Sequence, residues 1–327
     1  MAEPVARRIR QQASNEIKDK PATAKVACLV LFQSGTDDGP ASAIDRQTVE
    51  LVQELLEENL PEPVDTIDVW LDSPGGDPHA AYKLVLALRE KCRTLRVVIP
   101  DYAKSAATLF ALGCDEIFMG FAAELGPLDI QIEHPDREGV GVSGLDVAQA
   151  LEFIGDYALD YAIAGGAKVL RFTGLPRSDV LREFLGFVAE LLQPVVTKLD
   201  PNLIHRAQNQ LRIAQDYAVK LLCERPNKNP GMSVTWAKTL VRHLVQNYPA
   251  HGFVISRDEA EKQLKLPILP AEGYQFWGQA KQRYRAFAKQ LRPEGESDID
   301  LFLASNLDTQ TERIPAKGEE NNGKETH

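Results

Sequence analysis

Cysteine is scarce in this sequence, and the few cysteines form no recognisable site. There are four among 327 residues, scattered as Cys28, Cys92, Cys114 and Cys223. No two of them make a C-x-x-C pair, so the pattern indicates neither a zinc site nor a disulfide framework. We therefore expect reduced thiols, no metal and no cofactor.

Long apolar runs are missing as well. The longest extends from Val26 to Phe32, far short of the roughly 18 residues that a membrane span requires. Residues 1–20 alternate charged and polar side chains without the apolar centre of a signal peptide. These absences predict a cytoplasmic protein, and they leave a weak association with a membrane or a partner protein open.

An excess of positive charge is also absent. Lys and Arg total 37 and Asp and Glu total 47, which gives a net charge of −10. A general nucleic-acid binder needs a basic surface. We therefore expect no nucleic-acid partner.

The sequence does contain a regular alternation of strand-like and helix-like segments. This order predicts a parallel sheet with crossover helices, followed by a largely helical region from residue 144 to 246. Strands are expected at 25–32, 64–71, 95–99 and 116–119, and helices at 44–59, after Asp77, at 105–112 and at 201–224. We divide the chain into a polar leader (1–22), an α/β core (23–175), a helical region with a C-terminal core element (176–275), and a terminal helix with a mostly disordered acidic tail (276–327).

Two turns stand out because each directly follows a strand of this sheet. In the first, the adjacent Gly75 and Gly76 permit positive φ and a close approach of a ligand to the backbone. In the second, Ser105 stands between a buried strand and an apolar helix, with the small Ala103 and Ala106 beside it. Taken alone, the first is typical of a tight connection and the second of a helix cap. Both nevertheless lie at the carboxyl ends of strands, where open α/β sheets bind ligands.

Four segments in this order resemble the Clp-fold serine peptidases, and among them the serine dehydrogenase proteinase family, relatives of the Clp proteolytic subunit and signal peptide peptidase A. The segments are 71–78, 103–109, 112–120 and 124–131, and a fifth at 248–260 resembles the family's C-terminal signature. The resemblance implies a Clp/crotonase-type α/β fold of parallel βαβ units with a helical C-terminal region. It also implies a serine peptidase (a hydrolase), either ATP-independent or assisted by a partner. A crotonase-type acyl-CoA enzyme and a catalytically weak assembly or binding protein remain alternatives on the same fold.

By the resemblance, Ser105 is the nucleophile and attacks a peptide or protein substrate to form an acyl-enzyme. The backbone N–H groups of Gly76 and Ala106, beside Gly75, would form the oxyanion hole. The relatives assemble into trimers or rings, so a homo-oligomer is expected.

The residue that acts as the general base is harder to assign, because the sequence departs from the family pattern. Asp129 stands where the Clp subunit has a histidine, and His251, two residues before Phe253, stands where it has an aspartate. A serine hydroxyl needs a base that works near neutral pH, so we expect His251 to be the base and Asp129 to orient it. Lys104 is a rival, since related signal peptide peptidases use a Ser–Lys pair, and Lys168 is a further candidate.

Residues 139–144 fit the G-x-G-x-x-G pattern of dinucleotide-binding proteins. That motif acts only between a strand and a helix of a βαβ unit, and the segment before it, His134-Pro-Asp-Arg-Glu, does not read as a strand. We therefore interpret these residues as a loop over the active site.

Overall fold

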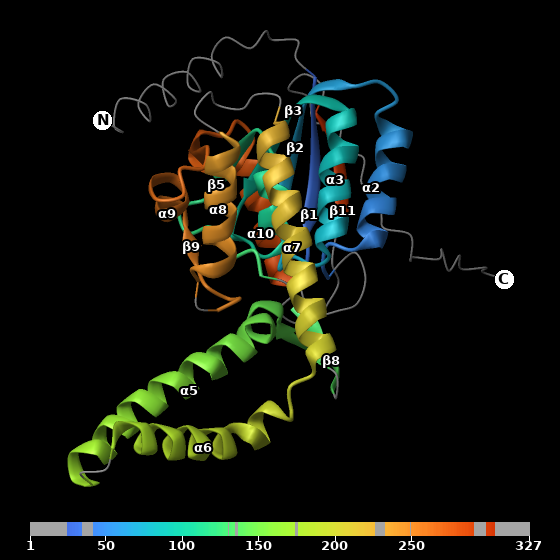
Figure 1. Ribbon diagram of the computed structural model, residues 1–327. Coiled ribbons are helices and arrows are strands. Elements are labelled where there is room, and N and C mark those ends of the chain that lie inside the picture. Colours follow the sequence, from blue (N-terminus) through green and yellow to red (C-terminus); the bar gives the residue numbers. More distant parts are fainter. Residues whose placement is uncertain are drawn as a thin grey trace, which may run out of the picture.

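The computed structural model describes residues 25–34, 42–129, 131–134, 137–173, 176–225, 233–248, 250–290 and 299–304. Its centre is a six-stranded sheet in the order β10-β5-β3-β2-β1-β11 (Figure 1). These strands are β1 (Val26–Phe32), β2 (Val64–Asp72), β3 (Cys92–Ile99), β5 (Glu116–Met119), β10 (Ile268–Pro270) and β11 (Ile299–Ala304). All neighbours pair in parallel except β11, which runs antiparallel to β1. The predicted α/β fold with a parallel sheet is therefore confirmed.

Helices cover both faces of this sheet, and strand β1 shows how the sequence specifies it. Leu29 and Leu31 point into the core beneath α2, α3, α4, α7 and α8, whereas Val30 and Phe32 point to the opposite face, under α10. A strand buried on both faces is apolar at nearly every position, as parallel strands commonly are. The helices are α2 (Arg46–Asn59), α3 (Pro78–Glu90), α4 (Ala106–Leu112), α7 (Pro201–Glu224), α8 (Val234–Gln246), α9 (Arg257–Lys262) and α10 (Trp277–Gln290), with a 3-10 turn at Ala271–Gly273.

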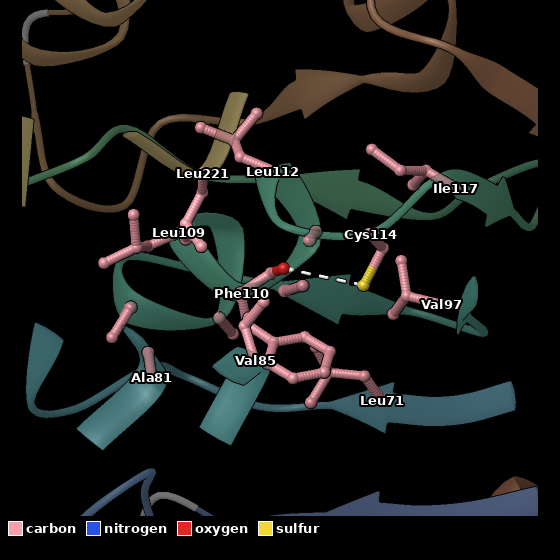
Figure 2. Close-up of a cluster of buried hydrophobic side chains, with 14 of the residues drawn as sticks. Leu71, Ala81, Val85, Val97, Leu109, Phe110, Leu112, Cys114, Ile117 and Leu221 are labelled. Carbon is pink, nitrogen blue, oxygen red and sulfur yellow. Dashed lines mark hydrogen bonds between the residues drawn. The ribbon is translucent and has the colours of Figure 1, made fainter. Parts of the chain in front are cut away.

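Helix α4 is the most deeply placed of these elements, since all seven of its residues are buried. Figure 2 shows Phe110 of α4 among Leu71, Val85 and Val97, which come from β2, α3 and β3. The residue before this helix is Ser105. The backbone that carries Ser105 is therefore fixed by the core.

A small three-stranded sheet lies beside the main one. It consists of β4 (Tyr102–Ala103), β6 (Glu124–Leu125) and β9 (Ile255–Ser256), with β6 in the middle. It joins the turn before Ser105 to a segment about 150 residues later in the chain. This small sheet brings the C-terminal signature segment to the predicted site.

Helices α5 (Gly144–Thr173) and α6 (Arg177–Val196) form an antiparallel hairpin that extends away from the α/β body (Figure 1). We call residues 144–196 the arm. No helix within the described residues is long and apolar enough to cross a membrane.

Several local predictions can be compared with these elements. Asp77 caps α3 by accepting a hydrogen bond from the His79 N–H at 2.9 Å, and Pro78 is the first helical residue. The loop expected at 139–144 is wrong, because β8 (Arg137–Ser143) pairs with β7 (Gln131–His134) in a hairpin. The leader at 1–22 lies outside the described residues, as does the tail beyond 304, so the division into domains stays a prediction.

Candidate active site

The two turns that the sequence places at neighbouring strand ends lie in direct contact. A Cβ atom added to Gly75 would come within 2.8 Å of the Ser105 Cβ and 2.9 Å of the Ala106 nitrogen. Gly75 also has a φ of +109°, which disfavours any other residue. Backbone hydrogen bonds hold the turns together, from Ser73 N–H to the Tyr102 carbonyl and from Lys104 N–H to the Ser73 carbonyl, at 3.1 and 3.0 Å. Glycine at position 75 is therefore what lets the first turn reach Ser105.

Ser105 has a strained backbone. Its φ is 48° and its ψ is −117°, a combination that non-glycine residues rarely adopt and that costs about 1–3 kcal/mol. Such strain is typical of a serine nucleophile on a sharp strand-to-helix turn. The side chain is buried, and its hydroxyl donates a 2.6 Å hydrogen bond to the backbone carbonyl of Asp129.

Of the three candidate oxyanion-hole N–H groups, two have no hydrogen-bond partner in the part of the chain that the structure describes. The Gly75 N–H donates to the Ser73 hydroxyl at 3.1 Å. The N–H groups of Gly76 and Ala106 donate no hydrogen bond within the described residues. Unpaired N–H groups on two touching turns beside a serine hydroxyl suit a developing oxyanion.

His251 and Asp129 also lie together. The Nδ1 atom of His251 is 3.3 Å from Oδ2 of Asp129. The two atoms are not aligned for a hydrogen bond, and neither has another partner among the described residues. The other carboxylate oxygen, Oδ1, accepts the Leu145 N–H at 2.9 Å. Since Asp129 contacts Ser105 through its carbonyl and His251 through its carboxylate, all three predicted residues meet in one place.

The two lysines occupy different positions. The ammonium group of Lys104 lies 2.7 Å from the Glu124 carboxylate and donates to the carbonyls of Phe253 and Leu125, at 3.1 and 3.4 Å. These contacts tie β4 to β6 and to the segment that carries His251. Lys168 lies near the far end of α5, in the part of the arm that leaves the α/β body (Figure 1). Among the described residues, neither ammonium group forms a hydrogen bond with the Ser105 hydroxyl.

Three of the four cysteines are poor candidates for a nucleophile. Burial raises the pKa of the Cys92 thiol to about 12 and also raises the pKa of the Cys28 and Cys114 thiols. A nucleophilic cysteine must be a thiolate. Cys28, Cys92 and Cys114 are therefore unsuited to nucleophilic attack.

We expect Gly75→Ala to damage both folding and turnover. The added Cβ has to displace the Lys104–Ala106 backbone and to adopt an unfavourable φ, which costs about 1–3 kcal/mol of unfolding free energy. A shift of about 1 Å in Ser105 should lower turnover by about 10²-fold. Denaturant unfolding and peptide hydrolysis assays would measure the two effects. Gly252→Ala is the matched control, because its Cβ would enter open space beside His251; equal losses in both variants would contradict the contact between the turns.

A second prediction concerns Asp72, which is buried at the end of β2. Burial raises the pKa of its carboxyl well above the usual range, although the hydrogen bond from the Tyr102 N–H opposes this shift. The folded protein therefore holds the proton more tightly than the unfolded chain, and stability is lost as the pH rises above about 4. Asp72→Asn keeps an acceptor for Tyr102 and cannot ionise, so at pH 8 it should be more stable than the wild type by about 1–3 kcal/mol. Urea unfolding at pH 5 and pH 8 would test this, and a stability difference that does not grow with pH would contradict it.

Sequence reasoning missed the residues that support this site. Ser73 donates a 2.5 Å hydrogen bond to the Gln33 side chain and receives the Gly75 N–H, which stiffens the glycine turn. Leu145, the second residue of α5, holds Asp129 through its backbone N–H alone. No sequence signal could have found Leu145, because any residue there offers the same donor.

Comparison with known proteins identifies a related family over part of the chain. Residues 47–140 match the family described as ClpP-like SDH-type serine proteinase, which confirms the resemblance over that segment. The segment includes the glycine turn, Ser105 and Asp129 but not His251. Two uncharacterized proteins of Methanocaldococcus jannaschii are 41% and 40% identical to this chain over 86 residues, which is 26% of the chain. The chain spans about 30% of the length of these curated relatives.

Two solved structures are similar to parts of the chain. A mutant of the 1510-N membrane-bound stomatin-specific protease is 15% identical, with a TM-score of 0.30, over 50% of this chain and 71% of that one. ClpP1 from Listeria monocytogenes is 14% identical, with a TM-score of 0.25, over 48% of this chain and 78% of that one. Likenesses of this strength carry no argument about the site.

Proposed function

We propose that the protein is a serine peptidase that cleaves peptide bonds in peptides or unfolded protein segments through an acyl-enzyme on Ser105. One observation carries the proposal: a serine with a strained backbone contacts, through its hydroxyl, the same aspartate that faces His251, and it adjoins N–H groups that have no partner among the described residues. Strain persists where surrounding structure enforces it, commonly at catalytic residues. The match of residues 47–140 to ClpP-like serine proteinases supports the same conclusion.

The reaction would begin when the Ser105 hydroxyl leaves the Asp129 carbonyl by rotating about its Cα–Cβ bond. His251 would take the hydroxyl proton as the oxygen attacks the substrate carbonyl, and the Asp129 carboxylate would orient the ring and stabilise the imidazolium. The N–H groups of Gly76 and Ala106 would bind the oxyanion. His251 would then protonate the leaving amine, and water would release the acyl group by the same route.

The alternative function, a crotonase-type acyl-CoA enzyme, requires different groups at the turn that carries Ser105. An acyl-CoA enzyme of that kind needs the oxyanion hole but no serine nucleophile. An enzyme without a serine nucleophile gains nothing from a strained backbone at Ser105. In a serine peptidase, the strained backbone presents the hydroxyl to the substrate. This observation favours the peptidase.

A fluorophosphonate probe tests the proposal directly, because it reacts only with an activated serine. The probe should label the wild-type protein on one peptide, the one that contains Ser105, and should not label Ser105→Ala. Ser73→Ala is a useful control, since Ser73 is a buried serine in the adjoining turn. Labelling of Ser105→Ala equal to that of the wild type would overturn the proposed nucleophile.

A further inference from the structure

Arg225 is a buried cation that the proposed mechanism does not use. It directly follows α7, and only 3% of its surface is exposed. Burial lowers the pKa of its guanidinium group to about 10, so the group stays charged at neutral pH. Among the described residues it forms no ion pair with a carboxylate. Since removing a charge from water is costly, another group has to stabilise this one.

The group that stabilises it is the C-terminal end of α4. The Nε atom of Arg225 donates to the Leu112 carbonyl at 2.8 Å, and a terminal nitrogen of the guanidinium group donates to the same oxygen. Leu112 is the last residue of α4, and carbonyls at a helix C-terminus lack helical partners and attract cations. Arg89 of α3 donates to the next carbonyl, that of Gly113, at 2.5 Å. Two guanidinium groups therefore hold the end of α4 that lies opposite Ser105.

The N-terminal end of α4 is packed tightly against the glycine turn. Ser105 has its φ of 48° at this point, and a strained residue relaxes unless the surrounding structure prevents it. With seven residues, α4 is about 10 Å long. A small withdrawal of the helix along its axis, away from Gly75, would give Ser105 the room to relax. The carbonyls at the far end point along this axis away from Ser105, so the Arg225 guanidinium group lies directly behind the helix.

We infer that Arg225 is a positioning residue for the reaction at Ser105, because it holds α4 against the glycine turn and so keeps Ser105 in its strained conformation. The Ser105 hydroxyl and the Ala106 N–H both belong to the N-terminal end of α4. A withdrawal of α4 would therefore displace the nucleophile and one oxyanion-hole donor together. The catalytic part of this inference rests on the proposed peptidase function, whereas the effect on the Ser105 backbone does not.

A simple capping role for Arg225 differs from this positioning role in its consequences. A cap stabilises the folded protein by satisfying the Leu112 carbonyl, and its loss lowers stability whatever residue stands at position 105. A positioning role also couples Arg225 to the conformation of Ser105 at the other end of the helix. Energetic coupling between two residues that do not touch is what a double-mutant cycle measures.

Urea unfolding tests the effect on the Ser105 backbone without any assay of activity. Glycine tolerates a φ of 48° and alanine does not, so Ser105→Gly should unfold at a higher urea concentration than Ser105→Ala. When Arg225→Met is added to both variants, α4 is free to withdraw and residue 105 relaxes. The difference between the two midpoints should then vanish or reverse, because glycine contributes only its entropic cost. The matched control is Val30→Ala, which removes a buried side chain on the opposite face of the sheet and should leave the difference unchanged.

The rate of fluorophosphonate labelling tests the catalytic part. Folded Arg225→Met should be labelled at Ser105 about 10²-fold more slowly than the wild type, as expected for a displacement of about 1 Å. Arg225→Lys keeps the positive charge but lacks the planar fork that places two donors on one carbonyl, so it should restore the rate only in part. Val30→Ala should be labelled at the wild-type rate, since its loss of stability does not involve α4.

A midpoint difference between Ser105→Gly and Ser105→Ala that is the same with and without Arg225→Met would overturn the inference. Labelling of folded Arg225→Met at the wild-type rate would also overturn it. If the wild type is not labelled at all, the proposed peptidase function fails, and the urea midpoints alone decide the role of Arg225. If Arg225→Met does not fold, Arg225→Lys replaces it in both measurements. A smaller midpoint difference and slower labelling would then support the inference, and values equal to those of the wild type would contradict it.

Discussion

Ser105→Ala should lower the rate of peptide hydrolysis by about 10³-fold or more, as expected when a nucleophile is removed and only the oxyanion hole and substrate binding remain. The loss should appear in kcat, because the hydroxyl acts in the chemical step. The measurement is kcat and KM on any peptide or unfolded protein that the wild type cleaves. Turnover within tenfold of the wild type would show that another group performs the reaction.

Ser105→Gly separates the chemistry from the backbone strain. Both variants lose the hydroxyl and its hydrogen bond to the Asp129 carbonyl, so both should lack activity. Glycine tolerates a φ of 48°, whereas alanine keeps the strain. Relief of about 1–3 kcal/mol of strain, offset by about 0.5–1 kcal/mol of glycine entropy, should make Ser105→Gly the more stable of the two by about 1 kcal/mol. Equal denaturant midpoints would show that the turn stores no strain.

The sequence was most informative where local chemistry decides the structure. The strand run at 25–32 and the capping residue Asp77 needed only period, composition and capping rules, and the structure agrees with both. The glycine turn and Ser105 were recognisable because parallel strands place their carboxyl ends at one edge. Contact between the two turns then follows from the topology.

Contacts between distant segments were much harder to anticipate. The Lys104 ammonium group binds the Phe253 carbonyl because β4, β6 and β9 pair in the small sheet. Strands of only two residues cannot be recognised from the sequence. The 2.6 Å bond from Ser105 to the Asp129 carbonyl involves a backbone atom, which every residue possesses. The strand at 137–143 was mistaken for a loop because its glycines are typical of loops and its partner strand is only four residues long.

The arm shows a second limit of prediction from sequence, which concerns whether an apolar helix is buried. The sequence indicates a largely helical region between 144 and 246, but it does not indicate which apolar side chains the chain itself covers. Whether an apolar helix is buried in its own chain depends on where the chain turns. Here α5 and α6 extend away from the sheet (Figure 1), so apolar residues that would belong to a core remain exposed among the described residues.

His251→Ala should lower kcat/KM by about 10²–10⁴-fold at neutral pH, the usual contribution of a general base. The reason is that Nδ1 of its ring faces the buried Asp129 carboxylate, and in the proposed mechanism the other ring nitrogen accepts the serine proton. A histidine base also predicts a wild-type rate that falls as the pH drops below about 7, where imidazoles become protonated. The pH–rate profile of His251→Ala should lack this decline in its residual activity.

Lys104→Met is the comparison that decides between the two bases, because it removes the ammonium group from the Glu124 and Phe253 contacts while keeping most of the side-chain volume. If Lys104 only holds the segment that carries His251, this variant should retain the wild-type decline below about pH 7 and lose far less activity than His251→Ala. A lysine base would give the opposite result, since it works only when burial has lowered its pKa. Lys104→Met would then abolish both turnover and fluorophosphonate labelling, and His251→Ala would leave the acid limb of the profile intact. The shape of the profile is the informative measurement, because a purely structural defect in either variant would lower the rate equally at every pH.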